Sequence, residues 1–97
     1  MATLRYFYSN TIAGFMEKSA DAIIGHMVRK SPFSDNNETK DSWEEEIEIL
    51  KEILVEYKDR GSVYFEYNVP RMGTRADVVL LIDGVVFVLE FKTANRK

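Results

Sequence analysis

The ionisable residues in the last third of the 97-residue sequence include Asp77, Glu90 and Lys92. Two carboxylates and a lysine at this spacing could form a site that binds a cation through carboxylate oxygens. This region contains two runs of β-branched and large apolar residues joined by Asp83-Gly84. Asp-Gly between such runs favours a two-residue type I′ turn, which needs positive φ at both positions. In that register Asp77 faces Glu90, and Lys92 lies on the same side of the sheet because side chains alternate along a strand.

Two facing carboxylates are unfavourable in a sheet. Facing residues have Cβ atoms about 5 Å apart, and like charges placed so are destabilising. At an effective dielectric constant of about 20 the repulsion is roughly 3 kcal/mol. A divalent cation between Asp77 and Glu90 would turn the repulsion into binding, because hard cations take carboxylate and carbonyl oxygens. The alternative is that Lys92 neutralises one acid and that the strand ends lie in water.

The elements that position these side chains are predicted to be helices followed by a sheet. Residues 3–8 indicate a short strand or an extended lead-in, and two short helices follow within residues 1–37. The main helix is predicted over 41–59, since its apolar residues recur at spacings of 4, 3, 4 and 3. That stripe consists of Trp43, Ile47, Leu50, Leu54 and Tyr57.

The sheet is predicted over 62–92, as a strand followed by the hairpin. Short connections make neighbouring strands antiparallel. The sequence therefore predicts one α+β domain over 1–97, with N-terminal helices followed by a three-stranded antiparallel meander.

Other ionisable residues have less specific interpretations. On the helix pattern alone, Glu46 is a solvated residue beside the apolar stripe. Glu66 is interpreted as a cross-strand pairing residue rather than a catalytic one. Arg71 and Arg75, in the turn before the hairpin, are suited to contact phosphates or to lie solvated in the turn. His26 is predicted to be a surface or half-buried helix residue rather than a metal ligand.

Composition limits the class of protein. The chain has no cysteine and therefore no disulfide framework. It has neither the pattern of a signal peptide nor a continuous apolar segment long enough to span a membrane. We therefore expect a cytoplasmic protein without a membrane partner. Its net charge is −3, and residues 38–60 hold nine acids against four bases. No global basic field attracts nucleic acid, so such binding needs a local patch or a bound cation.

A helix bearing an acid, then a strand, then a hairpin carrying Asp77 and Glu90-Phe91-Lys92 resembles the PD-(D/E)xK nuclease superfamily. The chain also resembles, more narrowly, the N-terminal region of bacterial schlafen-like or helicase-like P-loop ATPases. The segments that carry this second likeness are 5–10, Trp43 with 46–47, 64–81 and 90–92.

The resemblance implies a restriction-endonuclease-like core in which Asp77, Glu90 and the Phe91 carbonyl hold Mg²⁺ or Mn²⁺. It also implies that Lys92 orients the attacking water or stabilises developing charge, and that Glu46 binds the ion through water or binds a second metal. Ala76 stands where the motif's name has proline.

The superfamily core continues after Glu-x-Lys with a helix and a further strand, whereas this sequence ends five residues later. We therefore expect an incomplete core whose open edge favours a protein partner or a homo-oligomer.

The expected function is a metal-dependent phosphodiesterase (nuclease) that acts on nucleic acid, or a truncated remnant of one. An alternative is a non-catalytic protein-binding module, such as a phage-type inhibitor of a host nuclease or defence complex. A third is a regulatory or assembly domain separated from the ATPase.

Overall fold

The computed structural model describes residues 6–30, 37–69 and 74–91 of the chain. Within these residues the elements follow one another in the order β1 (Tyr8–Thr11), α1 (Ile12–Glu17), α2 (Ala20–Lys30), α3 (Asn37–Ile53), the 3₁₀ turn η1 (Val55–Tyr57), β2 (Gly61–Val69), β3 (Thr74–Ile82) and β4 (Val85–Leu89). In these ranges no helix has both the length and the apolar character needed to cross a membrane.

The strands form one antiparallel sheet in the order β1-β2-β3-β4. The predicted α+β class is confirmed, and the expected three-stranded meander is extended by a fourth strand. Residues Tyr8–Thr11 of β1 pair with Ser62–Phe65 of β2. This pairing joins segments that are far apart in the sequence, so local periodicity does not reveal it.

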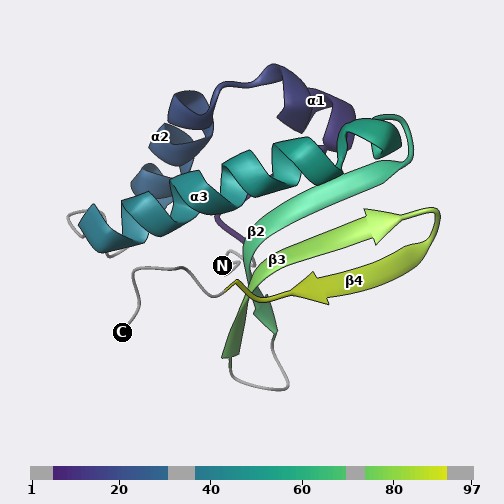
Figure 1. Cartoon of the computed structure of the whole chain (residues 1–97). Coiled ribbons are helices and arrows are strands. Elements are labelled where there is room, and N and C mark those ends of the chain that lie inside the picture. Colours follow the sequence, from purple (N-terminus) through teal and green to yellow (C-terminus); the bar gives the residue numbers. More distant parts are fainter. Residues whose placement is uncertain (1–5, 31–36, 70–73, 92–97) are drawn as a thin grey trace.

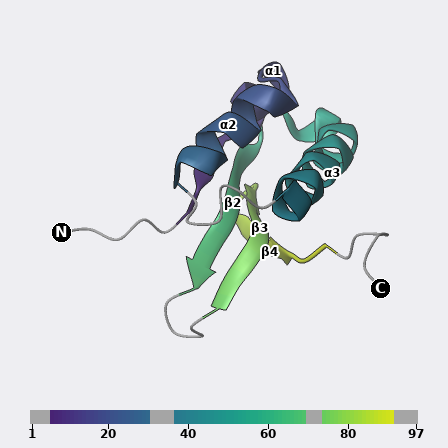
Figure 2. The ribbon, with the colours of Figure 1, turned by 90° about the vertical axis from the view of Figure 1, so that its left-hand side faces the viewer.

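The helices α1, α2 and α3 lie on one side of the sheet (Figures 1 and 2). Side chains from these helices and from the facing side of β2 and β3 form the hydrophobic core. Its fully enclosed large side chains are Phe15, Phe65, Ile12, Ile23, Met27, Ile47, Leu50, Leu54, Val63 and Val78. The apolar stripe predicted for the main helix therefore packs into the core.

The hairpin of β3 and β4 has the predicted register. Asp83 and Gly84 have φ values of 54° and 81°, as a type I′ turn requires. Ile82 pairs with Val85, and the register continues to Val78 opposite Leu89. The ladder ends there, so β4 stops short of the predicted limit at residue 92.

The main helix begins and ends earlier than predicted. It was expected over 41–59, whereas α3 spans Asn37–Ile53 and is followed by η1 at Val55–Tyr57. A tightened 3₁₀ turn is common at the C-terminal end of a helix. The amide of Leu54 still donates to the carbonyl of Leu50, and the amide of Tyr57 donates to Leu54. After a turn over residues 58–60 the chain enters β2 at Gly61, where a Cβ atom would overlap the Leu81 carbonyl oxygen.

Candidate functional site

Glu46, on α3, is buried in the protein interior although it carries a carboxyl group. Only 5% of its surface is exposed, and its Oε1 atom has no hydrogen-bond partner among the described residues. Burial, followed by the negative charges of Asp77, Glu66 and Glu45, raises the pKa of Glu46 to about 8. The interpretation of Glu46 as a solvated residue is therefore wrong. The packing of α3 against the sheet, which the helix pattern alone does not specify, encloses it.

Glu66 interrupts the ladder between β2 and β3. Its φ is 55°, in the left-handed region that a non-glycine residue rarely adopts. The residue pairs on both sides keep one register, which places Glu66 opposite Asp77, but these two residues are not paired with each other. The prediction of simple cross-strand pairing for Glu66 is therefore wrong.

The reversed backbone at Glu66 changes which side chains share a face of β2. Phe65 lies in the core, and the next residue, Glu66, also reaches the helix side, because its Oε2 accepts a hydrogen bond from Trp43 Nε1 at 3.3 Å. Tyr64 and Tyr67 pack edge to face, with ring centroids 5.9 Å apart. The normal alternation of faces is therefore broken at Glu66, and an acid points toward helix α3.

The three acids Glu46, Glu66 and Asp77 influence one another electrostatically. The pKa of Glu66 is raised, first by burial and then by the negative charge of Asp77. The hydrogen bond from Trp43 and the positive charge of Arg75 oppose this rise. Each of the two glutamates is thus close enough to Asp77 for its charge to matter. We call Glu46, Glu66 and Asp77 the acidic cluster.

Asp77 also holds the C-terminal end of β4. Its Oδ2 accepts a hydrogen bond from the backbone N–H of Phe91 at 2.8 Å. Glu90 was predicted to face Asp77 across the hairpin, but it lies just beyond the last pair of the ladder and is exposed. Phe91 is partly buried against the core. Lys92 lies outside the described residues.

The remaining predicted site residues are less closely associated with the acidic cluster. Arg75 is exposed, and its guanidinium carbon lies 4.7 Å from the centre of the Phe7 ring. Arg71 lies outside the described residues. His26 is partly buried on α2, edge-on to Tyr8, as expected for a half-buried helix residue.

The donor chemistry of the acidic cluster suits a hard divalent cation. Within the described ranges, no three histidine, aspartate or glutamate side chains are close enough together to form a metal site by themselves. Mg²⁺, however, is usually bound through one or two carboxylates and keeps several waters. The buried, unpartnered oxygen of Glu46 fits such an ion. Of the predicted ligands that follow β4, Phe91 lies next to Asp77 through its amide, whereas Glu90 is exposed.

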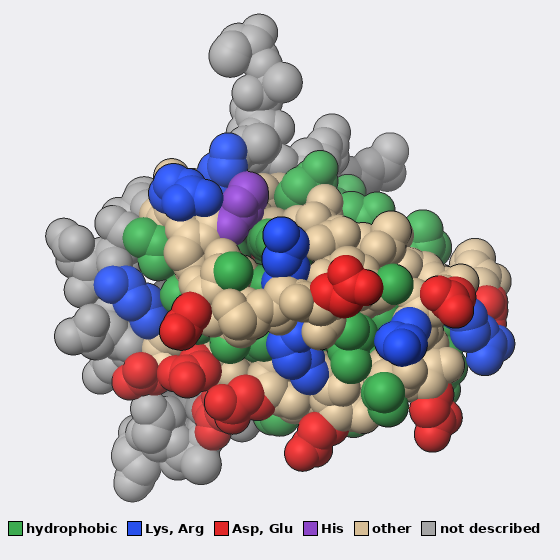
Figure 3. Space-filling view, turned by 90° about the horizontal axis from the view of Figure 1, so that it is seen from above, with side chains coloured by type: hydrophobic (Ala, Val, Ile, Leu, Met, Phe, Trp, Pro, Cys, Tyr) green, Lys and Arg blue, Asp and Glu red, His purple; other side chains and the backbone are tan. Residues whose placement is uncertain are grey.

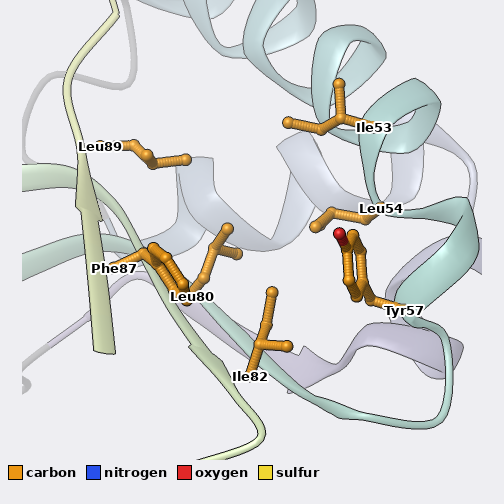
Figure 4. A pocket seen from close by; sticks show the side chains of 7 residues that line it. All are labelled: Ile53, Leu54, Tyr57, Leu80, Ile82, Phe87 and Leu89. Atoms are coloured by element: carbon orange, nitrogen blue, oxygen red, sulfur yellow. The ribbon is translucent and has the colours of Figure 1, made fainter. Parts of the chain in front are cut away.

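A separate apolar pocket of about 330 Å³ opens between the end of α3 and the β3–β4 hairpin. Figure 4 shows the side chains of the two strands pointing toward those of α3 and η1 across it. It is lined by Ile53, Leu54, Tyr57, Leu80, Ile82, Phe87 and Leu89. No carboxylate or cation lines this pocket, so it does not belong to the acidic cluster.

Exposed charge on the helical side is mixed. Figure 3 shows several acidic side chains along the lower border of this face and others interspersed with basic side chains across it. The exposed acids of α3 are Asp41, Glu44, Glu45, Glu48 and Glu52. The outer surface of α3 would therefore repel a phosphate backbone, and a nucleic acid would have to approach from another side.

We compared the chain with protein-family models, with curated proteins and with solved structures, and found no match in any of the three.

Proposed function

We propose that this chain is a divalent-cation-dependent phosphodiesterase domain that cleaves nucleic acid. The observation that supports it best is the buried, unpartnered carboxylate of Glu46 beside Asp77. Burying a carboxyl group without a partner costs free energy, and perturbed acids in folded proteins concentrate at functional sites. An acid on α3, then Asp77 on β3, and then Glu90 and Lys92 after β4 in the sequence agree with the likeness to the PD-(D/E)xK nucleases.

In this proposal Asp77, Glu90 and the Phe91 carbonyl hold Mg²⁺ or Mn²⁺, and Glu46 supports the ion. The bound ion would polarise a phosphoryl oxygen and lower the pKa of a water molecule. The hydrogen bond from the Phe91 amide to Asp77 fixes the end of β4, and with it the backbone that carries Glu90.

Three basic residues are assigned to the substrate. Lys92, two residues after Glu90, would stabilise the charge that develops on the phosphate. Arg75, which is exposed, and Arg71 would contact the phosphate backbone and so fix the position of the nucleic acid without reading its sequence.

Cleavage of single- and double-stranded DNA and of RNA, with Mg²⁺ or Mn²⁺ and with a chelator, tests this function. We expect cation-dependent cleavage that falls about 100- to 1000-fold in Lys92→Ala, since removing one group that stabilises transition-state charge has an effect of that size. Asp77→Asn should abolish it. Glu48→Gln, which removes an exposed acid from α3, is the matched control and should retain activity. Cleavage that persists in Asp77→Asn would exclude the proposed site.

A second candidate function is protein binding through β4, and a specific observation favours it. Four successive apolar residues of this edge strand are exposed, by 53% at Val85, 62% at Val86, 45% at Phe87 and 61% at Val88. An uncharged, apolar edge strand is a template for pairing with another chain. The apolar pocket of Figure 4 adjoins it through Phe87 and Leu89.

Self-association measured by light scattering tests this second candidate. We expect the wild-type chain to form a dimer or a larger assembly as its concentration rises, and Val88→Lys to remain monomeric. Val88 lies on the opposite face of β4 from Phe87, so the substitution leaves the lining of the pocket in place. A wild-type chain that stays monomeric at all concentrations contradicts assembly through β4.

A further inference from the structure

Glu66 adopts a backbone conformation that its residue type disfavours. Its φ of 55° is readily adopted by glycine, which has no Cβ, but is strained for a glutamate. Non-glycine residues held in this region cluster at functional sites, where the surrounding structure maintains the strain. Glu66 is left out of the ladder, but the pairs on both sides of it keep one register, so no turn or change of register requires the reversal.

The reversal places a carboxylate among buried groups on the helix side of the sheet. Trp43, itself buried, donates its indole N–H to Glu66 Oε2. Asp77 lies opposite Glu66 in the register, and the charges of both raise the pKa of Glu46. Trp43 occupies one acceptor position of Glu66, and an ionised carboxylate has about four. The carboxylate can therefore accept hydrogen bonds from further donors, such as water molecules bound to a cation.

The fold gives this cluster little compensating positive charge within its described residues. Arg75 affects Glu66 electrostatically, but it is exposed and lies over the Phe7 ring. The Oε1 atom of Glu46, in the described part of the chain, has no partner at all. A buried acid either keeps its proton or has its charge compensated by a partner or a metal, so a cation at this cluster would supply the compensation that the described residues lack.

We propose that Glu66 supports a cation held at Glu46 and Asp77 without ligating the ion itself. Its carboxylate accepts hydrogen bonds from water bound to the ion, and Trp43 fixes its orientation. The inference rests on the proposed function for the choice of a hard divalent cation, but it does not depend on cleavage. It adds a residue from β2, the strand before the hairpin, to the acids of α3 and β3.

Terbium binding, detected through Trp43, tests the inference. Tb³⁺ is a hard, oxygen-preferring ion, and its luminescence is sensitised when an excited indole lies close to it. Trp43 is the single tryptophan of the chain, so excitation at the red edge of tryptophan absorption reports an ion beside Glu66. Mn²⁺ and Mg²⁺ should displace Tb³⁺ and abolish the emission. Competition with these ions also gives their affinities.

Two substitutions at Glu66 distinguish the effect of its carboxylate from the effect of its backbone conformation. Glu66→Gln keeps the shape and an oxygen that can accept from Trp43. Glu66→Gly removes the side chain at a position whose φ suits glycine, so its fold should be retained. We expect both variants to bind Mn²⁺ about 10- to 100-fold more weakly, the range typical when a group supporting a metal site is lost. Circular dichroism verifies that each variant is folded.

Glu48→Gln provides the matched control, because it removes the same charge from an exposed position on α3. Its Mn²⁺ affinity should stay within about twofold of the wild type, since surface charges are screened. If the Glu66 variants bind as tightly as Glu48→Gln, or if the wild-type chain gives no sensitised emission, the inference is overturned. A chain that binds Tb³⁺ in a Glu66-dependent way but cleaves no nucleic acid would refute the proposed function alone.

Discussion

Helix α3 carries two ionisable side chains that are withdrawn from water, Glu46 and Lys51, and the fold treats them differently. Lys51 Nζ donates to the carbonyl oxygens of Phe15, Met16 and Lys18 at 2.8, 3.2 and 2.7 Å. These carbonyls lie at the C-terminal end of α1, where a helix leaves acceptors without intrahelical donors and where a cation is favourable. Burial lowers the pKa of Lys51, and the three acceptors compensate its lost hydration.

Glu46 has no such explanation within the described fold. One of its carboxylate oxygens lacks a hydrogen-bond partner. The charges that act on its pKa are the negative charges of other acids, and they raise it. A partly buried group whose bonding is complete is explained by stability, as Lys51 is. A buried group whose bonding is incomplete lowers stability, and under the proposed function a bound cation would complete the bonding of Glu46. The comparison therefore explains Lys51 by its structural role, and it supports the role proposed for Glu46 at a cation site.

The largest expected effect concerns the pH dependence of stability in the absence of metal. The folded-state pKa of Glu46 is raised from its ordinary value of 4.5 to about 8. Between these pH values the unfolded chain has lost this proton and the folded chain retains it, so the free energy of unfolding falls as pH rises. Each pH unit corresponds to about 1.4 kcal/mol, so the full effect is on the order of 5 kcal/mol. Below pH 4.5 the penalty is absent, and above pH 8 it is complete.

Glu46→Gln should remove most of this slope. Urea denaturation with chelator present, from pH 4 to pH 9, should find the variant similar to the wild type at low pH and more stable at high pH. Burial also raises the pKa of Glu66, so a weaker slope of the same sign should remain. Equal slopes in the two proteins would show that Glu46 is not a buried, unpaired acid, and the contrast with Lys51 would fail.

The sequence was sufficient to predict features that depend on residues close together in the sequence. The Asp83-Gly84 turn set the register of the hairpin, and the stripe of apolar residues on α3 became its buried face. The contacts that distinguish Glu46 from Lys51 were not predictable, because each depends on segments distant in the sequence. The acceptors of Lys51 belong to α1, and the neighbours of Glu46 belong to β2 and β3.

Glu66 was missed for a different reason. Positive φ is usually indicated by glycine, asparagine or aspartate, and none of these residues occupies this position. The available signal was an acid on the strand before the hairpin, which is also the pattern of ordinary cross-strand pairing. The position of Asp77 on the hairpin was predicted, but its hydrogen bond to the Phe91 amide was not, since it forms where the ladder ends.

A smaller effect is expected from Lys51→Met, which keeps the apolar stem and removes the ammonium group. The variant loses three charge-assisted hydrogen bonds and a contact between Nζ and the Phe15 ring, whose centroid is 4.8 Å away. The carbonyls of α1 are partly exposed and regain water, so the loss should be that of about one strong bond, roughly 2 kcal/mol. Urea denaturation at neutral pH measures it.

Lys58→Met, at an exposed lysine beyond η1, is the control and should change stability by less than about 0.5 kcal/mol.

Glu46 and Lys51 should also differ in how metal changes the effect of their substitution. Lys51→Met should lower stability by the same amount with and without Mn²⁺, because its acceptors lie at α1 and not at the acidic cluster. In Glu46→Gln, by contrast, the gain in stability should shrink when Mn²⁺ is added, since only the wild-type carboxylate is stabilised by the ion. A metal-dependent effect at Lys51, or a metal-independent one at Glu46, would reverse the roles assigned to them.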